Sequence, residues 1–449
     1  MKKNSTLYVC SKCDAQYPKW AGRCLECGSW GTVKESTEQA PSKTSTKAVK
    51  FNTETLIDLK NISDKQFARM STRIKELDDI LGGGIVPGSI NLLGGDPGIG
   101  KSTLVLQILK NLESLDRPLL YVSGEESAEQ IKLRMNRLKY IPKNLKFLSE
   151  TNIEQVCAAI QELKPAIAII DSIQTVYSSD VDNEAGNVAQ IRACTVKIME
   201  VAKKNNIPVI ITGHVTKDGS VAGPKTLEHL VDVVLYIEGD KLHGFRLIRS
   251  NKNRFGSTDE LGVFEMTSTG LKEVNDPSRA FLANNQEITA GSVVSCFLDG
   301  KRIFLIEVQA LVTPTIFGYP QRKTAGFDIN RLQMITAVLF KRANLNLNNQ
   351  DIHLNVAGGF KVTETGIDLA VAMAVASALK NKFINKQTIA IGEVGLGGEV
   401  RTVSNIEKRL TEAERLGFKT AFVPNVELTK KYQMNIIKLK NIKDITNNL

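Results

Sequence analysis

The segment from Gly95 to Ser102 combines residue types that bind phosphate groups. Its letters, GDPGIGKS, fit the pattern G-x-x-x-x-G-K-[ST], in which glycines let backbone N–H groups curl around phosphate oxygens. Lys101 can reach the β- and γ-phosphates, and the Ser102 hydroxyl can bind Mg²⁺. The pattern predicts that the chain binds a nucleoside triphosphate with Mg²⁺. The predicted nucleotide-binding residues of this segment are Gly95, Asp96, Pro97, Gly98, Ile99, Gly100, Lys101, Ser102 and Thr103.

Carboxylates follow two apolar runs that read as strands. Asp171 comes directly after AIAII, at a position where a carboxylate can organise Mg²⁺ and water. Glu125 and Glu126 follow LLYV, and a carboxylate there can activate the water that attacks the γ-phosphate. An acidic pair also commonly caps a helix, such as the one expected over residues 128–138. We expect Glu125, the nearer of the two to the strand end, to be the catalytic base.

Four cysteines form two C-x2-C hooks within the first 27 residues. Two such hooks direct four thiolates at one point and complete a tetrahedral site, so the spacing predicts a structural zinc ribbon; a redox-active C-x-x-C is the alternative. Tyr17, Trp20 and Trp30 either pack on this ribbon or stack on bases, and we expect packing. The predicted zinc ligands are Cys10, Cys13, Cys24 and Cys27, while the reduced core cysteines are Cys157, Cys194 and Cys296.

The phosphate-binding segment and the carboxylates need a scaffold that brings strand ends together. A strand precedes the segment and a helix begins near Lys101, which is the context that this motif requires. Helical stretches separate most of the other strands, so the pattern predicts a wound α/β domain with a mostly parallel sheet. The expected strands cover residues 89–93, 119–122, 166–170, 209–212 and 233–237.

The rest of the chain divides by composition. Residues 34–50 lose apolar side chains and gain Ser, Thr and Lys, which is typical of a linker. From about residue 276, a hairpin around Asp299 and Gly300 is followed by alternating helices and strands, typical of an α/β or α+β sandwich. We expect a zinc ribbon over 1–33, a linker over 34–58, an ATPase domain over 59–275 and a second α/β domain over 276–449.

Charge and hydropathy limit the partners. The net charge of +10 suits a polyanion such as nucleic acid, although many basic proteins bind none. No run approaches the 18 or so apolar residues of a membrane span, and the N-terminus lacks the apolar region of a signal peptide. We therefore expect a cytoplasmic protein without a membrane partner.

Several motifs together resemble known families. The stretch LDDILGGGIVPGS, the phosphate-binding segment, the glutamate after LLYV, IIDS and ITGHVTKDG resemble the core of RecA-fold ATPases. With the four-cysteine ribbon and KNRFG at residues 252–256, the chain resembles the RadA (Sms) family of bacterial DNA repair and recombination proteins over nearly its whole length. The resemblance implies a homohexameric ring related to DnaB-type helicases, a DNA-dependent ATPase that acts on single-stranded and branched DNA, with a recombinase among its partners.

In such rings a neighbouring subunit supplies cations to the γ-phosphate. The resemblance assigns this catalytic role to Lys252 and Arg254, because a trans-acting cation neutralises charge in the transition state. The same two residues could instead couple the nucleotide to DNA. Taken alone, RSNKNRFGS also reads as a solvated polar loop.

Two further segments are candidates for DNA contact. His214 follows a strand, where it could sense the γ-phosphate and relay its state to residues 215–225. That glycine-rich loop carries Lys217 and Lys225, which we expect to contact DNA; an ordinary connecting loop is the alternative. Residues 178–192, which end in Arg192, are the second candidate.

The last third resembles the C-terminal domain of Lon protease, with the ribosomal S5 domain 2-like fold. This raises the alternative of an ATP-dependent peptidase or chaperone with a Ser–Lys dyad. The dyad needs a serine where this chain has TETGID, and alignment puts Glu407 at the lysine position, next to Lys408. Thr363 or Thr365 would have to replace the serine, so we expect an inactive scaffold. Its outer face could meet duplex DNA through Arg322, Lys323 and Lys361, although solvated surface charge is the favoured interpretation.

The predicted fold is therefore α/β: a RecA-like ATPase core, an N-terminal zinc ribbon and a C-terminal Lon-like domain. The expected cofactors are ATP, magnesium and zinc. A KaiC-like signalling ATPase that binds no nucleic acid is the third hypothesis. The net charge, the lysine-bearing loop and KNRFG disfavour it.

Overall fold

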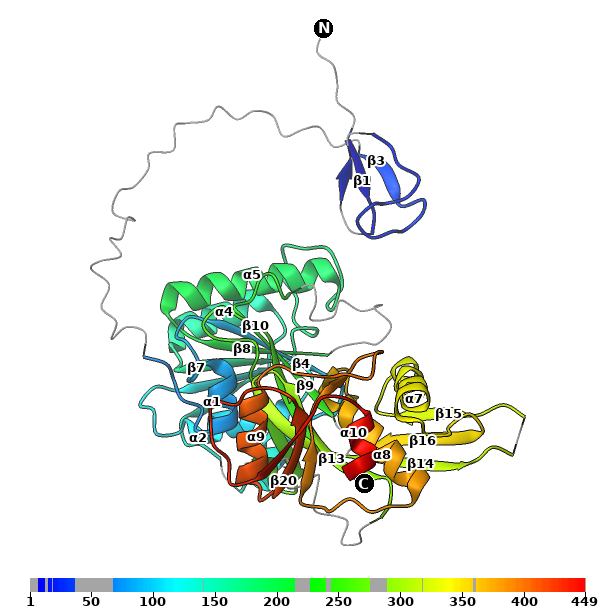
Figure 1. Cartoon of the computed structure of the whole chain (residues 1–449). Helices are drawn as coiled ribbons and strands as arrows, with labels where there is room; N and C mark the ends of the chain where they lie inside the picture. The colour runs from blue at the N-terminus through cyan, green and yellow to red at the C-terminus, as the bar shows by residue number, and fades with distance from the viewer. Residues whose placement is uncertain are drawn as a thin grey trace. The chain divides into compact units, whose positions relative to one another are not determined.

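The computed structural model of the chain consists of two compact units, Met1–Ala68 and Arg69–Leu449 (Figure 1). Among the described residues, no helix is long and apolar enough to cross a membrane. The structure describes residues 7–12, 15–17, 19–36, 68–139, 141–214, 227–239, 244–274, 289–316, 318–357 and 361–448.

The first unit contains a small three-stranded antiparallel sheet in the order β2-β1-β3. Its core consists of Cys10, Cys24 and Val33, with the rings of Tyr8 and Tyr17 packed against it. So small a core gives little hydrophobic stabilisation, which is why such modules depend on a metal. The strands are β1 (Leu7–Cys10), β2 (Gln16–Tyr17) and β3 (Val33–Ser36).

The second unit begins with a nine-stranded sheet in the order β12-β11-β10-β9-β4-β8-β7-β5-β6. The six strands from β9 to β6 in this order are parallel, and β10, β11 and β12 are antiparallel, which confirms the mostly parallel sheet. The carboxyl ends of the parallel strands therefore meet at one edge. The strands are β4 (Ile90–Gly95), β5 (Leu119–Ser123), β6 (Leu145–Leu148), β7 (Ile167–Asp171), β8 (Val209–His214), β9 (Val233–Gly239), β10 (Phe245–Asn253), β11 (Leu261–Thr267) and β12 (Gly270–Glu273).

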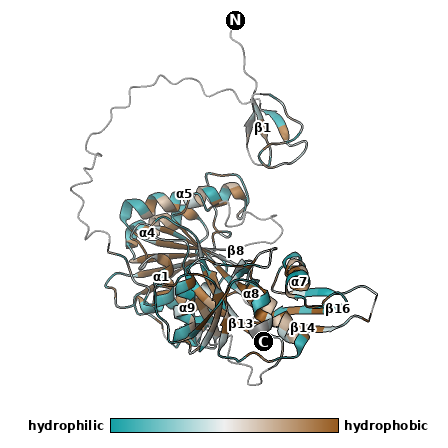
Figure 2. Cartoon of the chain, viewed as in Figure 1, coloured by the Kyte–Doolittle hydropathy of each residue, from teal (hydrophilic) through white to brown (hydrophobic). Residues whose placement is uncertain are grey.

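Helices cover both faces of this sheet because its central strands are apolar on both sides. Tyr121 and Ile169 face the helices α1 (Lys75–Leu81), α2 (Lys101–Asn111) and α3 (Ala128–Arg137). Leu120 and Ile170 face α4 (Ile153–Leu163) and α5 (Val188–Asn205). The hydropathy colouring in Figure 2 shows brown strands between helices with teal outer faces, as expected for a sheet buried on both sides.

The C-terminal lobe is built on a mixed seven-stranded sheet in the order β15-β16-β14-β13-β17-β20-β21. The hairpin predicted around Asp299 and Gly300 is confirmed as β13–β14. The strands are β13 (Ser292–Asp299), β14 (Arg302–Pro314), β15 (Arg322–Ala325), β16 (Gln350–Val356), β17 (Thr388–Ala390), β20 (Thr420–Pro424) and β21 (Asn435–Leu439), with a separate hairpin of β18 (Glu393–Val394) and β19 (Val400–Arg401).

The helices of this lobe also lie on both faces. The small-residue helix α8 (Asp368–Lys380) is buried along most of its length, because alanines and valines allow close packing on all sides. It shares one core with α7 (Ile329–Ala343) and α10 (Lys443–Asn448), whereas α9 (Ile406–Arg415) packs on the opposite face.

The lobe that contains the nine-stranded sheet and the C-terminal lobe share a hydrophobic core and a set of ion pairs. Phe245, Leu261 and Val263 of the first lobe cluster with Val293 and Phe297 of the second. Around them the β13–β14 hairpin makes three ion pairs. These are Arg302–Glu76 with two bonds of 2.6 and 2.7 Å, Arg249–Asp299 with two bonds of 2.6 and 2.7 Å, and Lys301–Glu260 at 2.7 Å.

Candidate nucleotide-binding and zinc sites

The predicted phosphate-binding segment lies between β4 and α2, at the carboxyl edge of the sheet. Gly95 ends β4 beside Ile237, and a Cβ at Gly95 would lie 2.7 Å from the Ile237 oxygen. Gly100 has a φ of 121°, which favours glycine, and it precedes the first turn of α2. The Ile99 carbonyl accepts a hydrogen bond of 3.0 Å from Arg246 Nε on β10. Arg246, which the sequence did not single out, therefore anchors the loop from β10, which is separated from β4 by β9.

Lys101 points back into this loop. Its side chain is largely buried, with 4% of the residue exposed. Its Nζ donates to the backbone carbonyl oxygens of Gly95 and Asp96 at 2.9 and 3.0 Å. Nζ also lies 3.0 Å from His214 Nδ1. Burial lowers the pKa of Lys101, and the carboxylates of Asp171, Glu125 and Asp96 oppose that shift. A phosphate group would offer this ammonium stronger acceptors than the two carbonyls do.

Asp171 is fixed by two hydroxyl groups. Tyr121 on β5 donates to Asp171 Oδ2, and Thr212 Oγ1 on β8 donates to Oδ1 at 2.5 Å. Burial, followed by the charge of Asp171, raises the pKa of Tyr121 well above its ordinary value, so this hydroxyl remains a donor. Tyr121 was not among the functional residues predicted from the sequence. The available signal was a tyrosine inside an apolar strand, because a buried phenol needs a hydrogen-bond partner.

The two consecutive glutamates face different partners. Glu125 Oε1 accepts a hydrogen bond of 2.5 Å from Ser172 Oγ and lies 3.9 Å from His214 Nε2. Glu126 instead pairs with Arg134 of α3 at 2.7 Å, and its burial raises its pKa. The structure therefore brings Glu125, rather than Glu126, next to His214. Its role as catalytic base stays a prediction.

Lys252 and Arg254 lie at the other end of the strands. Asn253, between them, pairs with Val233 at the start of β9, whereas Gly95 pairs with Ile237. Four strand residues correspond to about 13 Å, so neither cation reaches the phosphate-binding segment of its own chain.

Each of the two cations has a local partner there. Lys252 Nζ donates to the backbone carbonyl oxygens of Glu228 and Val231 at 2.6 and 2.9 Å. Arg254, with half of its side chain exposed, pairs with the buried Asp232 at 3.2 Å. Arg254 is therefore the more available of the two for a second molecule.

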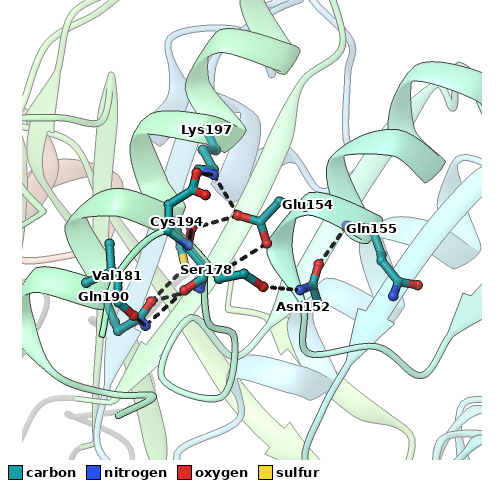
Figure 3. Close-up of polar contacts among 10 residues, drawn as sticks. Asn152, Glu154, Gln155, Ser178, Val181, Gln190, Cys194 and Lys197 are labelled. Atoms are coloured by element: carbon teal, nitrogen blue, oxygen red, sulfur yellow. Dashed lines mark hydrogen bonds and ion pairs between the residues drawn. The ribbon is translucent and has the colours of Figure 1, made fainter. Parts of the chain in front are cut away.

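The first candidate DNA segment, which carries Lys217 and Lys225, lies outside the described residues. The second follows β7 and leads into α5. Residues 178–187 form an ordered loop held by the side chain of Gln190, which accepts from Ser178 N at 2.8 Å and donates to the Val181 oxygen at 2.7 Å (Figure 3). Glu154 adds a second anchor, because it accepts from both Ser178 Oγ and Lys197 Nζ at 2.6 Å. The DNA role of this loop stays a prediction.

Replacing Glu154 with glutamine should loosen this loop in a pH-dependent way. Burial alone would raise the pKa of Glu154, but hydrogen bonds from Lys197 and Ser178 lower it to about 2. A carboxyl whose folded pKa lies below its unfolded value stabilises the fold above the unfolded pKa, and this contribution is lost as the pH falls from about 4.5 to 2.

We expect Glu154→Gln to reduce the free energy of unfolding at neutral pH by at most about 1 kcal/mol, because a pair one-third exposed is screened by solvent. The difference from the wild type should shrink toward pH 3 in urea titrations. Glu162→Gln, exposed on the same helix, is the control. A pH-independent difference would contradict the assignment.

The cysteine cluster has the dimensions of a metal site. The sulfurs of Cys10, Cys24 and Cys27 lie within 4.8 Å of one another, and those of Cys10 and Cys27 are 3.8 Å apart. Tetrahedral zinc with bonds of about 2.3 Å places its sulfurs about 3.8 Å apart, so these residues fit zinc. Cys13 lies outside the described residues. The Tyr17 hydroxyl, 3.2 Å from Cys24 Sγ, packs on the site as expected.

The expected packing is wrong for the two tryptophans. Trp20 is 64% exposed and Trp30 is 76% exposed, and the core of the ribbon is formed without either ring, by Cys10, Cys24 and Val33.

The described residues of the C-terminal lobe do not assemble a peptidase dyad. At the start of α8, Thr365 Oγ1 donates to Glu393 Oε2 at 2.7 Å. The cation beside it is the fully buried Arg409, which pairs with Glu364 and donates to the Cys296 oxygen at 3.0 Å. Glu407, at the aligned position, instead accepts from Thr429 N at 2.6 Å, and Lys408 is exposed. A guanidinium cannot be deprotonated in proteins, and so Arg409 cannot serve as the base.

The expected basic outer face is only partly available. Arg322 donates to the backbone oxygens of Leu347 and Gln350, and burial lowers its pKa. Lys323 and Lys361 are exposed. Arg322 therefore stabilises the chain locally, and the DNA role of the two lysines stays a prediction.

Comparisons with known proteins cover all three parts of the chain. Residues 8–35 match the rubredoxin metal binding domain, residues 58–220 match an AAA domain, and residues 315–427 match subunit ChlI of Mg-chelatase. The DNA repair protein RadA of Bacillus subtilis is 46% identical over 449 residues, which covers 98% of each chain. That of Listeria monocytogenes is 48% identical over 424 residues, covering 94% of this chain and 92% of the relative. Among solved structures, the RadB recombinase matches with a TM-score of 0.37 and 24% identity, over 46% of this chain and 99% of that one.

Proposed function

The chain belongs to the family of DNA repair protein RadA, and from this we propose that it is a DNA-dependent ATPase that works as a ring-shaped motor on single-stranded or branched DNA. It has a RecA-like ATPase core, a zinc ribbon and a Lon-like C-terminal domain. The observation that carries the proposal is the convergence of Lys101, Asp171, Glu125 and His214 at one edge of the sheet.

The proposed chemistry assigns one task to each group. Ser102 and the oriented carboxylate of Asp171 would hold Mg²⁺, which would supply positive charge to the phosphates. Lys101 exchanges its two carbonyl partners for phosphate oxygens. Glu125 takes a proton from the attacking water.

His214 is proposed to couple the nucleotide to DNA. It lies between Lys101 at 3.0 Å and Glu125 at 3.9 Å, so a movement of either side chain changes its surroundings. It also directly precedes residues 215–226, which carry Lys217 and Lys225. These lysines are proposed to contact the phosphates of single-stranded DNA in the ring channel.

Lys252 and Arg254 are proposed to act on the nucleotide of a neighbouring subunit. Their place at the far end of β9 from their own phosphate-binding segment supports this role. The alternative, in which they couple the nucleotide site to DNA, predicts a different result when subunits are mixed.

Mixing Arg254→Ala subunits with Lys101→Ala subunits should restore part of the ATPase activity that each variant lacks alone. In a mixed ring, some interfaces combine an intact Arg254 of one subunit with an intact Lys101 of the next. ATPase rate against mixing ratio measures this, with two batches of Arg254→Ala mixed as the control. If no ratio exceeds the sum of the separate rates, the trans role is lost.

The overall function is tested by the ATPase rate with and without single-stranded DNA, alongside casein proteolysis. We expect DNA to raise the rate and casein to stay intact. A rate that DNA leaves unchanged would favour a signalling ATPase, whereas casein cleavage that depends on ATP would favour a peptidase.

A further inference from the structure

Both tryptophans of the chain lie on the zinc ribbon, and both are exposed. The sequence contains two tryptophans, Trp20 and Trp30, with 64% and 76% of their surfaces exposed. Leu25, in the second cysteine hook, is also exposed, by 81%, but it has no π-face and does not belong to the surface formed by the two indoles. Large apolar surfaces in contact with water commonly mark interaction sites when several occur together on a small module.

The two indoles are held in place although they are exposed. Trp20 Nε1 donates to the Val33 oxygen at 3.1 Å, and its ring lies 3.5 Å from the position of a Cβ on Gly22. Trp30 lies opposite Arg23 across an antiparallel bridge, with the guanidinium carbon 5.8 Å from its ring centroid. Arg23 is itself fixed, because its Nε donates to the Gly28 oxygen at 3.0 Å. Little rotamer entropy would be lost when a ligand binds.

The available surface offers stacking rather than hydrogen bonding. The only donor of the Trp20 indole is already used within the ribbon, so its exposed surface presents apolar ring atoms. Such a surface suits a ligand with flat π-faces and no fixed pattern of donors, which is the property that nucleic-acid bases share.

The charges of the ribbon favour an anionic ligand. Lys19 is adjacent to Trp20 in the sequence, and Arg23 stacks on Trp30, so each indole has a cation next to it. Lysine is depleted at the centres of protein–protein interfaces, whereas cations beside aromatic rings are typical of single-strand binding surfaces. The exposed charged residues of the described ribbon are Lys12, Lys19, Arg23 and Lys34 against Glu26 and Glu35.

We propose that the zinc ribbon is a separate single-stranded DNA site, in which Trp20 and Trp30 stack on bases while Lys19 and Arg23 contact the adjacent phosphates. This inference rests on the proposed function in taking DNA as the ligand. It does not depend on the motor chemistry, because every residue in it lies in the first compact unit. Zinc would serve this site indirectly, by fixing the two cysteine hooks: Trp20 lies between them in the sequence, and Trp30 follows the second.

The full chain gives a direct test. Because both tryptophans lie in the ribbon, the intrinsic tryptophan fluorescence of the whole protein reports on the ribbon. Addition of an oligothymidylate of about 20 nucleotides should quench this fluorescence in a saturable way, and added salt should reverse the effect. A duplex of the same length should quench weakly, since its bases are already stacked.

The variants Trp20→Ala and Trp30→Ala should each weaken binding of a labelled oligothymidylate about tenfold, as expected for one lost base–aromatic stack. Zinc content should stay unchanged, because neither residue is a ligand. Leu25→Ala is the matched control, since it removes an equally exposed side chain without a π-face, and it should bind as the wild type does. If a tryptophan variant loses zinc, the wild-type quenching decides the question alone.

The failure of this inference differs from the failure of the proposed function. If DNA stimulates the ATPase but leaves the tryptophan fluorescence unchanged, the ribbon site is wrong and the motor proposal stands. If DNA neither binds nor stimulates, both are wrong. Quenching by a recombinase protein but not by oligothymidylate would show that the indoles dock a protein, and this would overturn the inference.

Discussion

Replacing Lys101 with alanine is expected to abolish ATP hydrolysis. The ammonium of Lys101 is the buried cation of the phosphate-binding segment, already held 2.9–3.0 Å from the loop oxygens and from His214. Its loss removes positive charge where negative charge develops in the transition state. We expect turnover to fall at least about 100-fold, which corresponds to about 3 kcal/mol.

Phosphate release under saturating ATP measures this loss, and nucleotide binding is followed separately with a fluorescent analogue. The matched control is Lys132→Ala, on the exposed face of α3 in the same lobe, which should keep wild-type turnover. The melting temperature should change little in either variant. Retained turnover in Lys101→Ala would refute the assignment of the phosphate-binding segment.

Replacing Arg302 with alanine should produce a large loss of stability. Glu76 is buried, and Arg302 provides two of its hydrogen bonds, at 2.6 and 2.7 Å. Without Arg302, the carboxylate retains the Val263 N–H at 3.3 Å but loses its opposite charge. Leaving one partner of a buried ion pair uncompensated costs about 3–5 kcal/mol, so unfolding should shift to clearly lower urea concentrations.

Lys301→Ala is a close control for this experiment. Lys301 is the adjacent residue and also makes an ion pair between the lobes, but its side chain is mostly exposed and its partner is Glu260. Exposed pairs contribute at most about 1 kcal/mol. Adding Glu76→Gln to Arg302→Ala should recover part of the loss. Equal effects of the two single variants would contradict the importance of the buried pair.

The parts of the site that lie in one continuous motif were predictable from the sequence. The phosphate-binding segment joins β4 to α2, and Asp171 and Glu125 follow apolar runs that could be read as strands. Such local patterns fix which edge of a parallel sheet a residue occupies. The four-cysteine ribbon was predictable for the same reason, because the two hooks set the ligand spacing.

The supporting residues were not predictable, because they depend on strand order. Tyr121 reaches Asp171 because β5 pairs with β7, and Arg246 reaches Ile99 from β10. No local pattern encodes which strands become neighbours. The cation beside Glu364 was not predictable for a related reason: the phase of α9 turns Arg409, rather than Glu407, toward Glu364 and Cys296, and the sequence alone leaves that phase open.

The core shared by the two lobes has a practical consequence for protein production. A chain that stopped near residue 275 would expose Phe245, Leu261 and Val263 to solvent and would leave Glu76 without Arg302. Exposed apolar clusters of this kind cause aggregation. The smallest soluble fragment that retains the ATPase machinery should therefore run from about residue 68 to the C-terminal helix. Limited proteolysis should accordingly leave the two lobes associated.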